Sequence, residues 1–210
     1  MLPRETVPAA IAEAIGAHGW SVTAQFLDES AAAALRAVAI ERRGAGEFRA
    51  ARVGRASGAA AAPAVRGDAI RWLAPDDPAA AVRNAFERLE TLRVVLNRAL
   101  FLGLASLEAH FAAYPPGARY GVHVDRFRDD DARVVSVVLY LNDAWTEADG
   151  GALRLYLERA GEPPSVDVPP AAGTLAVFLA DRHAHEVLPA RRDRYSLTGW
   201  FRRRGGPLVR

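Results

Sequence analysis

The second half of this 210-residue chain is a succession of short apolar segments, and this pattern constrains the fold more than any other feature. Clusters of proline, glycine and aspartate separate the segments, and these are the residues that turns require. Short strands at such even spacing are typical of an antiparallel sandwich or barrel. The expected strands are residues 107–114, 120–125, 133–142, 152–157, 166–168, 174–179, 185–188 and 194–202. The expected turns contain Pro115-Pro116-Gly117, Asp129-Asp130-Asp131, Asp149-Gly150-Gly151, Pro163-Pro164 and Pro169-Pro170.

The first hundred residues have a helical character instead. Apolar residues recur at helical spacing in three segments, 7–17, 29–42 and 79–100. Asp28 is expected to cap the second helix, and Asp76-Asp77-Pro78 to open the third. Short extended pieces are expected at 21–26 and 68–73, and a loop or loose hairpin in the glycine- and alanine-rich stretch 44–67.

These two halves predict one α+β, mainly β domain over residues 1–210. Its core is expected to be an eight-stranded double-stranded β-helix (jelly roll) over 104–204, and residues 1–103 to form a supporting helical layer.

The composition excludes several classes of chemistry. The chain has no cysteine, which excludes disulfides, thiolate-bound metals and thiol nucleophiles, and no lysine, which excludes a Schiff-base lysine. A net charge of +2 is too small to predict a nucleic-acid partner. No signal peptide is recognised and no apolar run reaches the length of a membrane span, so a cytoplasmic protein without a membrane partner is expected.

His123 and Asp125 are the first candidates for chemistry. On a strand, side chains two residues apart share a face about 7 Å apart, so these two can converge on one ion. They supply two thirds of the 2-His-1-carboxylate set that holds non-haem Fe(II) and leaves coordination positions open. The third ligand must come from a distant strand. His183 and His185 are the candidates, and their spacing alone does not choose between them.

Arg194 opens the last expected strand and is a candidate anion-binding residue. Burying an arginine is costly unless it meets an anion, and its planar group suits a carboxylate. Thr198 and Trp200 alternate with it on the same face of that strand.

From about residue 65 to 203 the chain resembles the Fe(II)- and 2-oxoglutarate-dependent prolyl 4-hydroxylases, specifically those of the Egl-nine type and their bacterial relatives. The matching motifs are Val65-Arg66-Gly67-Asp68 with Trp72, Tyr114-Pro115, Tyr120 with His123-Val124-Asp125, Val138-Leu139-Tyr140-Leu141-Asn142, Asp149-Gly150-Gly151 with Leu153-Arg154, His185-Glu186-Val187 with Pro189-Ala190, and Arg194-Tyr195 ending in Trp200. Their order and spacing make the resemblance specific, although the first 60 residues contribute little to it.

The resemblance implies a role for each matching position. The expected metal ligands are His123, Asp125 and His185, which selects His185 over His183. Arg194 is expected to bind the distal carboxylate of 2-oxoglutarate. Tyr140 and Thr198 would add hydroxyl donors, and Tyr114 and Trp200 would line the pocket. The expected cofactors and cosubstrates are Fe(II), 2-oxoglutarate, O2 and ascorbate.

The implied reaction is hydroxylation of a proline in a protein substrate, with elongation factor Tu as the first candidate, and release of succinate and CO2. A hydroxylase of a free amino acid or another small molecule is an alternative on the same iron site. A binding module that keeps the fold without catalysis is an alternative of another class.

The substrate entrance is expected near Arg66, Asp68 and Arg133, where ordinary surface ion pairs are the competing interpretation. Residues 44–67 are expected to form a loop on the substrate side, and the part around Gly54, Ser57 and Gly58 offers few side chains for gripping a substrate. His18 and His110 are interpreted as structural, and Trp72 and Trp145 as packing residues.

Overall fold

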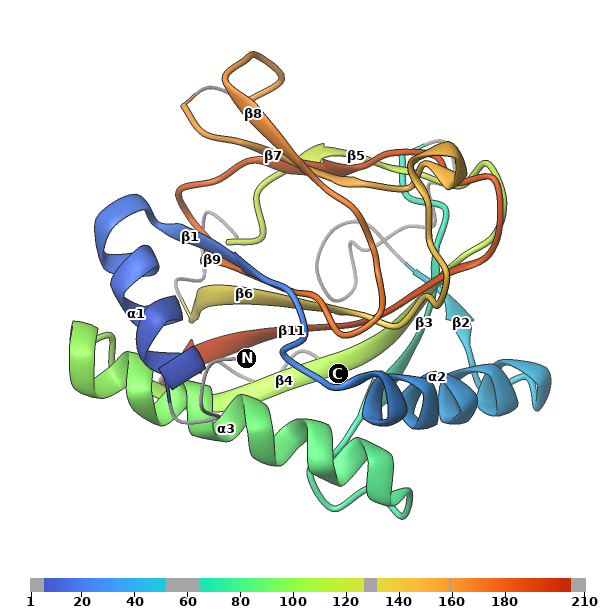
Figure 1. Ribbon diagram of the computed structural model, residues 1–210, viewed down its shortest axis with the longest axis horizontal. Coiled ribbons are helices and arrows are strands. Elements are labelled where there is room, and N and C mark those ends of the chain that lie inside the picture. The colour runs from blue at the N-terminus through green and yellow to red at the C-terminus, as the bar shows by residue number, and fades with distance from the viewer. Residues whose placement is uncertain (1–5, 52–64, 127–131, 159, 205–210) are drawn as a thin grey trace.

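The computed structural model describes residues 6–51, 65–126, 132–158 and 160–204. Two antiparallel sheets face each other, with three helices on one side (Figure 1). The larger sheet has the strand order β1-β9-β6-β11-β4-β3-β2, and the smaller sheet the order β5-β10-β7-β8. The expected turn at Asp129-Asp130-Asp131 and the stretch around Gly54, Ser57 and Gly58 lie outside the described residues.

All eight predicted strands are present and form the jelly roll, which confirms the predicted fold class. Four of them belong to each sheet. Those of the larger sheet are β4 (Leu104–Tyr114), β6 (Arg133–Tyr140), β9 (Leu175–Leu179) and β11 (Arg194–Arg203). Those of the smaller sheet are β5 (Tyr120–His123), β7 (Leu153–Tyr156), β8 (Ser165–Val168) and β10 (His185–Val187). A short 3-10 helix, η2 (Glu147–Asp149), precedes β7.

The first hundred residues contribute strands as well as helices. The helices are α1 (Thr6–His18), α2 (Glu29–Gly44) and α3 (Ala80–Leu100). The strands are β1 (Trp20–Thr23), β2 (Arg49–Ala50) and β3 (Ala69–Leu73). These strands extend the larger sheet at both edges, because β1 pairs with β9 and β3 pairs with β4. The first hundred residues therefore supply both the helices that cover the larger sheet and three of its strands. The division of the chain at residue 103 stays a prediction.

The N-termini of α2 and α3 are capped in different ways. Asp28 caps α2 as predicted, and its carboxylate accepts a hydrogen bond from the Ala31 N–H at 2.9 Å. The N-cap of α3 is Ala79, whose side chain cannot cap a helix. Asp77 accepts the Ala79 N–H at 3.0 Å and also binds Arg42 through two hydrogen bonds of 2.6 and 2.7 Å. Asp77, in the predicted acidic start of α3, therefore also joins the two helices through a buried ion pair with Arg42 of α2.

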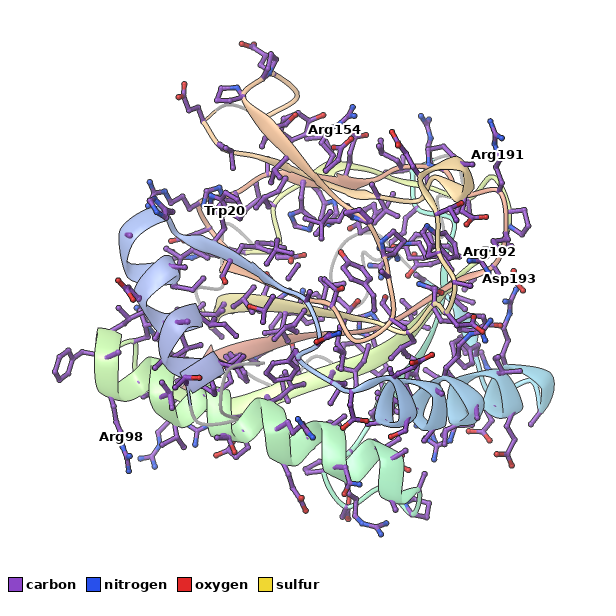
Figure 2. The ribbon with its side chains drawn as sticks, in the orientation of Figure 1. Trp20, Arg98, Arg154, Arg191, Arg192 and Asp193 are labelled. Atoms are coloured by element: carbon purple, nitrogen blue, oxygen red, sulfur yellow. The ribbon has the colours of Figure 1, made fainter. Side chains whose placement is uncertain are left out.

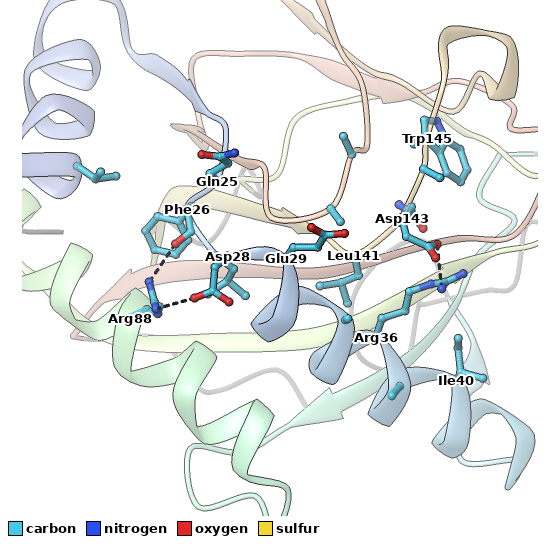
Figure 3. Close-up of a pocket in the computed structure, with 18 of the residues that line it drawn as sticks. Gln25, Phe26, Asp28, Glu29, Arg36, Ile40, Arg88, Leu141, Asp143 and Trp145 are labelled. Carbon is cyan, nitrogen blue, oxygen red and sulfur yellow. Dashed lines mark hydrogen bonds and ion pairs between the residues drawn. The ribbon is translucent and has the colours of Figure 1, made fainter. Parts of the chain in front are cut away.

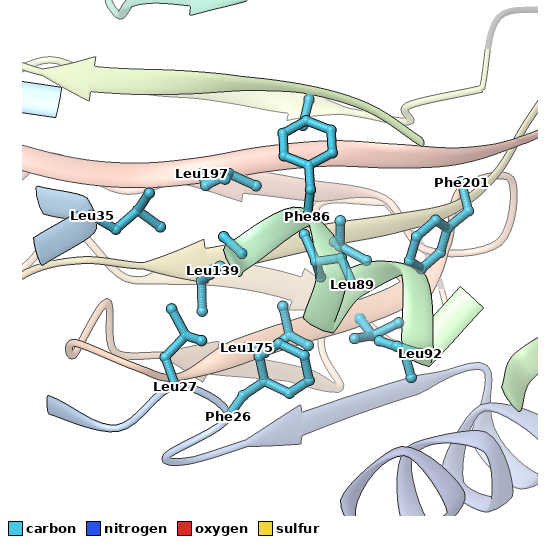
Figure 4. Close-up of a cluster of buried hydrophobic side chains, with 14 of the residues drawn as sticks. Phe26, Leu27, Leu35, Phe86, Leu89, Leu92, Leu139, Leu175, Leu197 and Phe201 are labelled. Atoms are coloured by element: carbon cyan, nitrogen blue, oxygen red, sulfur yellow. The ribbon is translucent and has the colours of Figure 1, made fainter. Parts of the chain in front are cut away.

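The main core lies between the helices and the outer face of the larger sheet (Figure 4). Leu89 and Leu92 of α3 pack there with Leu139, Leu197 and Phe201 of the sheet. A second apolar cluster lies between the two sheets and includes Tyr140, Leu155 and Phe178. Polar side chains such as Arg98 and Arg154 point away from the molecule (Figure 2). Among the described helices, none combines the length and apolar character that crossing a membrane requires.

Strand alternation decides which side chains of the larger sheet face the inside of the roll. On β11, Leu197 and Phe201 join the main core, whereas Arg194, Thr198 and Trp200 line the space between the sheets. On β4, Phe111 faces the helices and His110 faces the inside. The fold therefore presents one face of β4 and β11 to a cavity and buries the other face against α3.

Candidate active site

A cavity of about 220 Å³ lies between the two sheets and contains the candidate chemistry. Both sheets and the segment before β3 contribute to its wall. The lining residues are Arg66, Asp68, His110, Ala112, Tyr114, Tyr120, His123, Val124, Asp125, Arg133, Val138, Leu153, His185, Val187, Arg194, Thr198 and Trp200. Every predicted site residue except Tyr140 is in this wall, and Tyr140 lies in the cluster directly behind it.

A larger hollow of about 1100 Å³ lies on the helix side, between α2, α3 and the loop after β6 (Figure 3). Ion pairs bridge it, Arg36 with Asp143 at 2.9 Å and Arg88 with Asp28 at 3.7 Å. No histidine is among its lining residues. The smaller cavity is therefore the better candidate for catalysis, although it holds less space.

The structure brings His123, Asp125 and His185 together in the cavity wall. One ligand atom from each lies within 4.8 Å of the others. The Nε2 atom of His123 is 3.6 Å from Asp125 Oδ1, and that of His185 is 3.5 Å from Asp125 Oδ2. His123 ends β5, and Asp125 reaches the same point from the bend that follows the strand. Their role as metal ligands stays a prediction that this geometry allows.

Hydrogen bonds behind these side chains fix the direction of each donor atom. The Nδ1 atom of His123 lies 2.8 Å from the Gly121 carbonyl, and that of His185 lies 3.2 Å from the His183 carbonyl. Both Nε2 atoms therefore face the shared centre, the arrangement that metal-binding imidazoles use. Ser136 on β6 donates to Asp125 Oδ2 at 2.7 Å.

The protonation states also suit a cation. Burial lowers the pKa of His185 to about 4, so its imidazole is neutral and can donate a lone pair. Burial opposes ionisation of Asp125, but the neighbouring His185 and His123 hold its pKa well below the usual value. Two imidazoles and one carboxylate are the donor set of non-haem Fe(II) sites, so these residues fit the metal.

His183 does not belong to this group. It is buried, and its Nδ1 atom lies 3.1 Å from the Tyr156 carbonyl, outside the residues that line the cavity. β10 begins at His185, so His183 lies before the strand and its side chain need not point to the same face as that of His185. This is why the spacing of the two histidines could not separate them.

Arg194 lies in the cavity wall and is almost fully buried, with 1% of its surface exposed. Its Nε donates to the Gly151 carbonyl at 2.8 Å, while its Nη2 has no hydrogen-bond partner among the described residues. The hydroxyl of Tyr140 is likewise buried and unpaired there. Burial raises the pKa of Tyr140 to about 12, so the hydroxyl is a neutral donor. Two unpaired buried donors fit the carboxylate of an anionic ligand.

Tyr114, Thr198 and Trp200 complete this part of the wall. The guanidinium carbon of Arg194 lies 5.1 Å from the ring centre of Tyr114. The Thr198 hydroxyl is 3.2 Å from that of Ser196, and the indole N–H of Trp200 is buried without a partner among the described residues. Their contact with a cosubstrate stays a prediction.

The three predicted entrance residues line the cavity but are already paired within the protein. Arg66 binds Asp68 through two hydrogen bonds of 2.7 and 3.1 Å. Arg133 donates to Glu108 at 2.7 Å, and its guanidinium carbon lies 3.5 Å from the ring centre of Trp200. Glu108 also accepts from Arg202 at 2.8 Å. These contacts are built into the wall rather than exposed at the surface.

Among the lining residues that were not predicted as site residues, two have aromatic rings next to the predicted ones, His110 and Tyr120. His110, interpreted as structural, lies between the rings of Trp72 and Trp200, with centroid distances of 4.9 and 5.5 Å. Its position two residues before Ala112 and four before Tyr114 on one strand was a signal for the same face. Tyr120 was quoted in the family motif, but no role was assigned to it.

Comparisons with known proteins agree with this geometry. A model of the 2OG-Fe(II) oxygenase superfamily matches residues 109–202. The chain is 32% identical to human Egl nine homolog 1 over 143 residues, which cover 65% of this chain and 33% of that protein. The chain spans between 13% and 59% of the length of curated relatives of this kind.

Solved structures of prolyl hydroxylases match almost the whole chain. A Pseudomonas putida prolyl-4-hydroxylase is 46% identical, with a TM-score of 0.83, and the match covers 95% of this chain and 100% of that one. A prolyl hydroxylase from Trichoplax adhaerens, solved with a hypoxia inducible factor peptide fragment, is 26% identical with a TM-score of 0.85. That match covers 95% of this chain and 90% of the other.

Proposed function

The chain belongs to the 2OG-Fe(II) oxygenase superfamily, and from this premise we propose that it hydroxylates a prolyl residue within a protein substrate. The observation that carries the proposal is one cavity whose wall contains a His-Asp-His cluster and Arg194, which has an unpaired buried donor. The Tyr140 hydroxyl is a second unpaired buried donor, and the ring centre of Tyr140 lies 5.2 Å from the guanidinium carbon of Arg194. A metal-binding cluster and an anion-binding site in one cavity match the needs of an iron enzyme with a dicarboxylate cosubstrate.

His123, Asp125 and His185 would hold Fe(II) through their Nε2 and carboxylate oxygen atoms. With 2-oxoglutarate and O2, the bound iron would supply the oxidation that places one oxygen atom in the substrate and one in succinate, with release of CO2. Ser136 keeps Asp125 oriented, and the two backbone carbonyls keep the imidazoles in the tautomer that binds metal.

Arg194 and Tyr140 would bind the distal carboxylate of 2-oxoglutarate. The hydrogen bond from Arg194 Nε to Gly151 fixes the guanidinium, so its remaining edge can receive the anion. Thr198 would add a hydroxyl donor, and Tyr114 and Trp200 would border the cosubstrate. These residues position the cosubstrate and do not transfer protons.

Apolar side chains around the cluster would keep water from the reaction. Val138 of the larger sheet and Leu153 and Val187 of the smaller sheet line the same cavity. Excluding water strengthens the electrostatic contacts inside the cavity and protects reactive species from side reactions.

A protein substrate is supported by the Trichoplax adhaerens relative, which was solved with a peptide fragment. Arg66, Asp68 and Arg133 would border the entrance for such a chain, and elongation factor Tu is the first protein to assay. A cytoplasmic location and a need for ascorbate to keep the iron reduced remain parts of the proposal.

The test offers the purified enzyme proline-containing peptides, elongation factor Tu and free proline, with Fe(II) and 2-oxoglutarate in air. Succinate formation and a mass gain of one oxygen on a peptide or protein are expected. His185→Ala should remove both while leaving the circular dichroism spectrum unchanged. Oxygen on free proline alone would favour a small-molecule hydroxylase. No succinate with any substrate would favour a binding module.

A further inference from the structure

The ring of Tyr120 lies flat against the imidazole of His123. Their centroids are 3.6 Å apart and their planes differ by 15°. Strict strand alternation would place residues three apart on opposite faces. The register between β5 and β10 shifts, however: two steps on β10, from His185 to Val187, correspond to three steps on β5, from His123 to Tyr120. This bulge turns Tyr120 toward the same side as His123.

Arg66 contacts Tyr120 through both its side chain and its backbone. Its guanidinium carbon lies 4.7 Å from the centre of the Tyr120 ring, and the two residues form an isolated backbone bridge. The bidentate pair with Asp68, which is 3% exposed, fixes the guanidinium in place. A second backbone hydrogen bond, from the Gly121 N–H to the Val65 carbonyl at 2.8 Å, joins the same two segments.

The imidazole of His123 needs such a support. The hydrogen bond between Nδ1 and the Gly121 carbonyl restrains one edge of the ring, and this bond by itself does not stop the ring from tilting about it. His185 has a comparable arrangement, with a backbone carbonyl at Nδ1 and the edge of the Phe178 ring at a centroid distance of 4.7 Å. Besides the other imidazole, each of the two rings thus contacts a backbone carbonyl through Nδ1 and one aromatic side chain.

We infer that Tyr120, held by Arg66, is a positioning residue that fixes the ring plane of His123 for metal binding. The inference rests on the proposed role of His123 as a metal ligand. In this inference the face of the Tyr120 ring, not its hydroxyl, orients the imidazole of His123. Arg66 holds the Tyr120 ring in place, whether or not it also contacts a substrate.

Binding of Co(II) alone to the 210-residue chain tests this without turnover. The affinity and the visible absorption of bound Co(II) are measured for the wild type, Tyr120→Phe, Tyr120→Leu and His123→Ala. Tyr120→Phe should stay within about two-fold of the wild type because the ring remains. Tyr120→Leu should bind about 10- to 100-fold more weakly, as expected for loss of a residue that orients a ligand, and with a changed absorption spectrum.

The outcomes separate the inference from the proposed function. Wild-type affinity and spectrum in Tyr120→Leu would overturn the inference, as would an equal loss in Tyr120→Phe, because that would assign the effect to the hydroxyl. Wild-type Co(II) affinity in His123→Ala would overturn the proposed metal site instead. If Tyr120→Leu fails to fold by circular dichroism, Tyr120→Met, which fills more of the space, takes its place.

Arg66 has its own test. The paired variant Arg66→Met with Asp68→Asn removes both charges and leaves no buried carboxylate unpaired. Loss of a cation–π contact predicts about a three-fold weaker Co(II) affinity, smaller than the effect of Tyr120→Leu. No change in affinity would show that Tyr120 supports His123 without Arg66.

Discussion

His123 and His185 are register partners on neighbouring antiparallel strands, with ring centroids 4.2 Å apart. Side chains directly opposite in such a pair have Cβ atoms about 5 Å apart, so the sheet itself sets the spacing of the two imidazoles. Asp125 joins them from the bend after β5. Sheet pairing therefore brings residues distant in the sequence to one point, and the proposed metal site rests on the hydrogen-bonded pairing of β5 with β10.

Adding Co(II) to metal-free protein should raise its melting temperature. A cation that binds the folded state alone stabilises it by about 2.7 kcal/mol at a concentration 100 times Kd. For a chain of this size that corresponds to about 5–10 °C. Differential scanning fluorimetry measures the shift, and a chelator should reverse it. An equal shift in His185→Ala would show that Co(II) binds elsewhere.

Arg194→Ala should raise the KM for 2-oxoglutarate with a smaller effect on kcat. Loss of a buried charged partner costs about 3 kcal/mol, which corresponds to roughly 100-fold in affinity. Arg194→Lys should recover only part of the loss, because an ammonium lacks the planar fork. Steady-state kinetics give both constants. Arg154→Ala is the control, since its pair with Asp167 lies on the outer surface.

Gly151→Ala should weaken 2-oxoglutarate binding through Arg194. Gly151 has a φ of +70°, and an added Cβ would lie 2.8 Å from Ala190 Cβ and 3.2 Å from Arg194 Cδ. The change should lower the free energy of unfolding by about 1–2 kcal/mol from the left-handed backbone alone. It should also raise the KM, because the Gly151 carbonyl holds Arg194 Nε.

Gly161→Ala is the matched control for this prediction. Gly161 has a φ of +78° and open space around its Cβ position. It should show a similar loss of stability and an unchanged KM. If both variants left the KM unchanged, Gly151 would have no part in placing Arg194.

Asp77→Asn should destabilise the fold by about 3 kcal/mol at pH 7, because breaking a buried pair leaves Arg42 without its carboxylate. The hydrogen bonds from Arg42 outweigh burial and lower the pKa of Asp77 below its usual 3.8. The pair's contribution is therefore complete above about pH 4 and is lost as the pH falls through the lower folded-state pKa. Urea unfolding at several pH values should show the difference between wild type and variant narrowing only below about pH 4.

Asp167→Asn serves as the comparison for Asp77→Asn. Its pair with Arg154 is more than a third exposed on both sides, so it should contribute less than about 1 kcal/mol. An equal loss of stability in the two variants would contradict the distinction between buried and exposed pairs.

Evenly spaced apolar segments with turn residues between them predicted the eight strands of the jelly roll, and apolar residues at helical spacing predicted the three helices. The alternation of side chains along a strand predicted that Arg194, Thr198 and Trp200 share a face, and all three line the cavity. Local patterns report on a strand and its two faces, so these predictions needed no knowledge of distant contacts.

Features that depend on pairing between segments were harder to predict. The addition of β2 and β3 to the sheet depends on a partner strand, not on their own composition. The bulge that turns Tyr120 toward His123 is a property of two strands in register, which a single segment does not reveal. His110 looked structural because an isolated histidine in an apolar strand carries no sign of what it faces.

The chain uses β11 for two purposes, with Leu197 and Phe201 in the main core and Arg194 and Thr198 in the cavity. Substitutions on this strand therefore affect both the core and the cavity, and if Arg194 and Thr198 bind the cosubstrate as proposed, few of them can be neutral. Gly161, Glu162 and Pro163, between β7 and β8, are exposed and belong neither to the core nor to the cavity wall. Directed evolution of new substrate preferences should accordingly begin in such peripheral loops and leave β11 untouched.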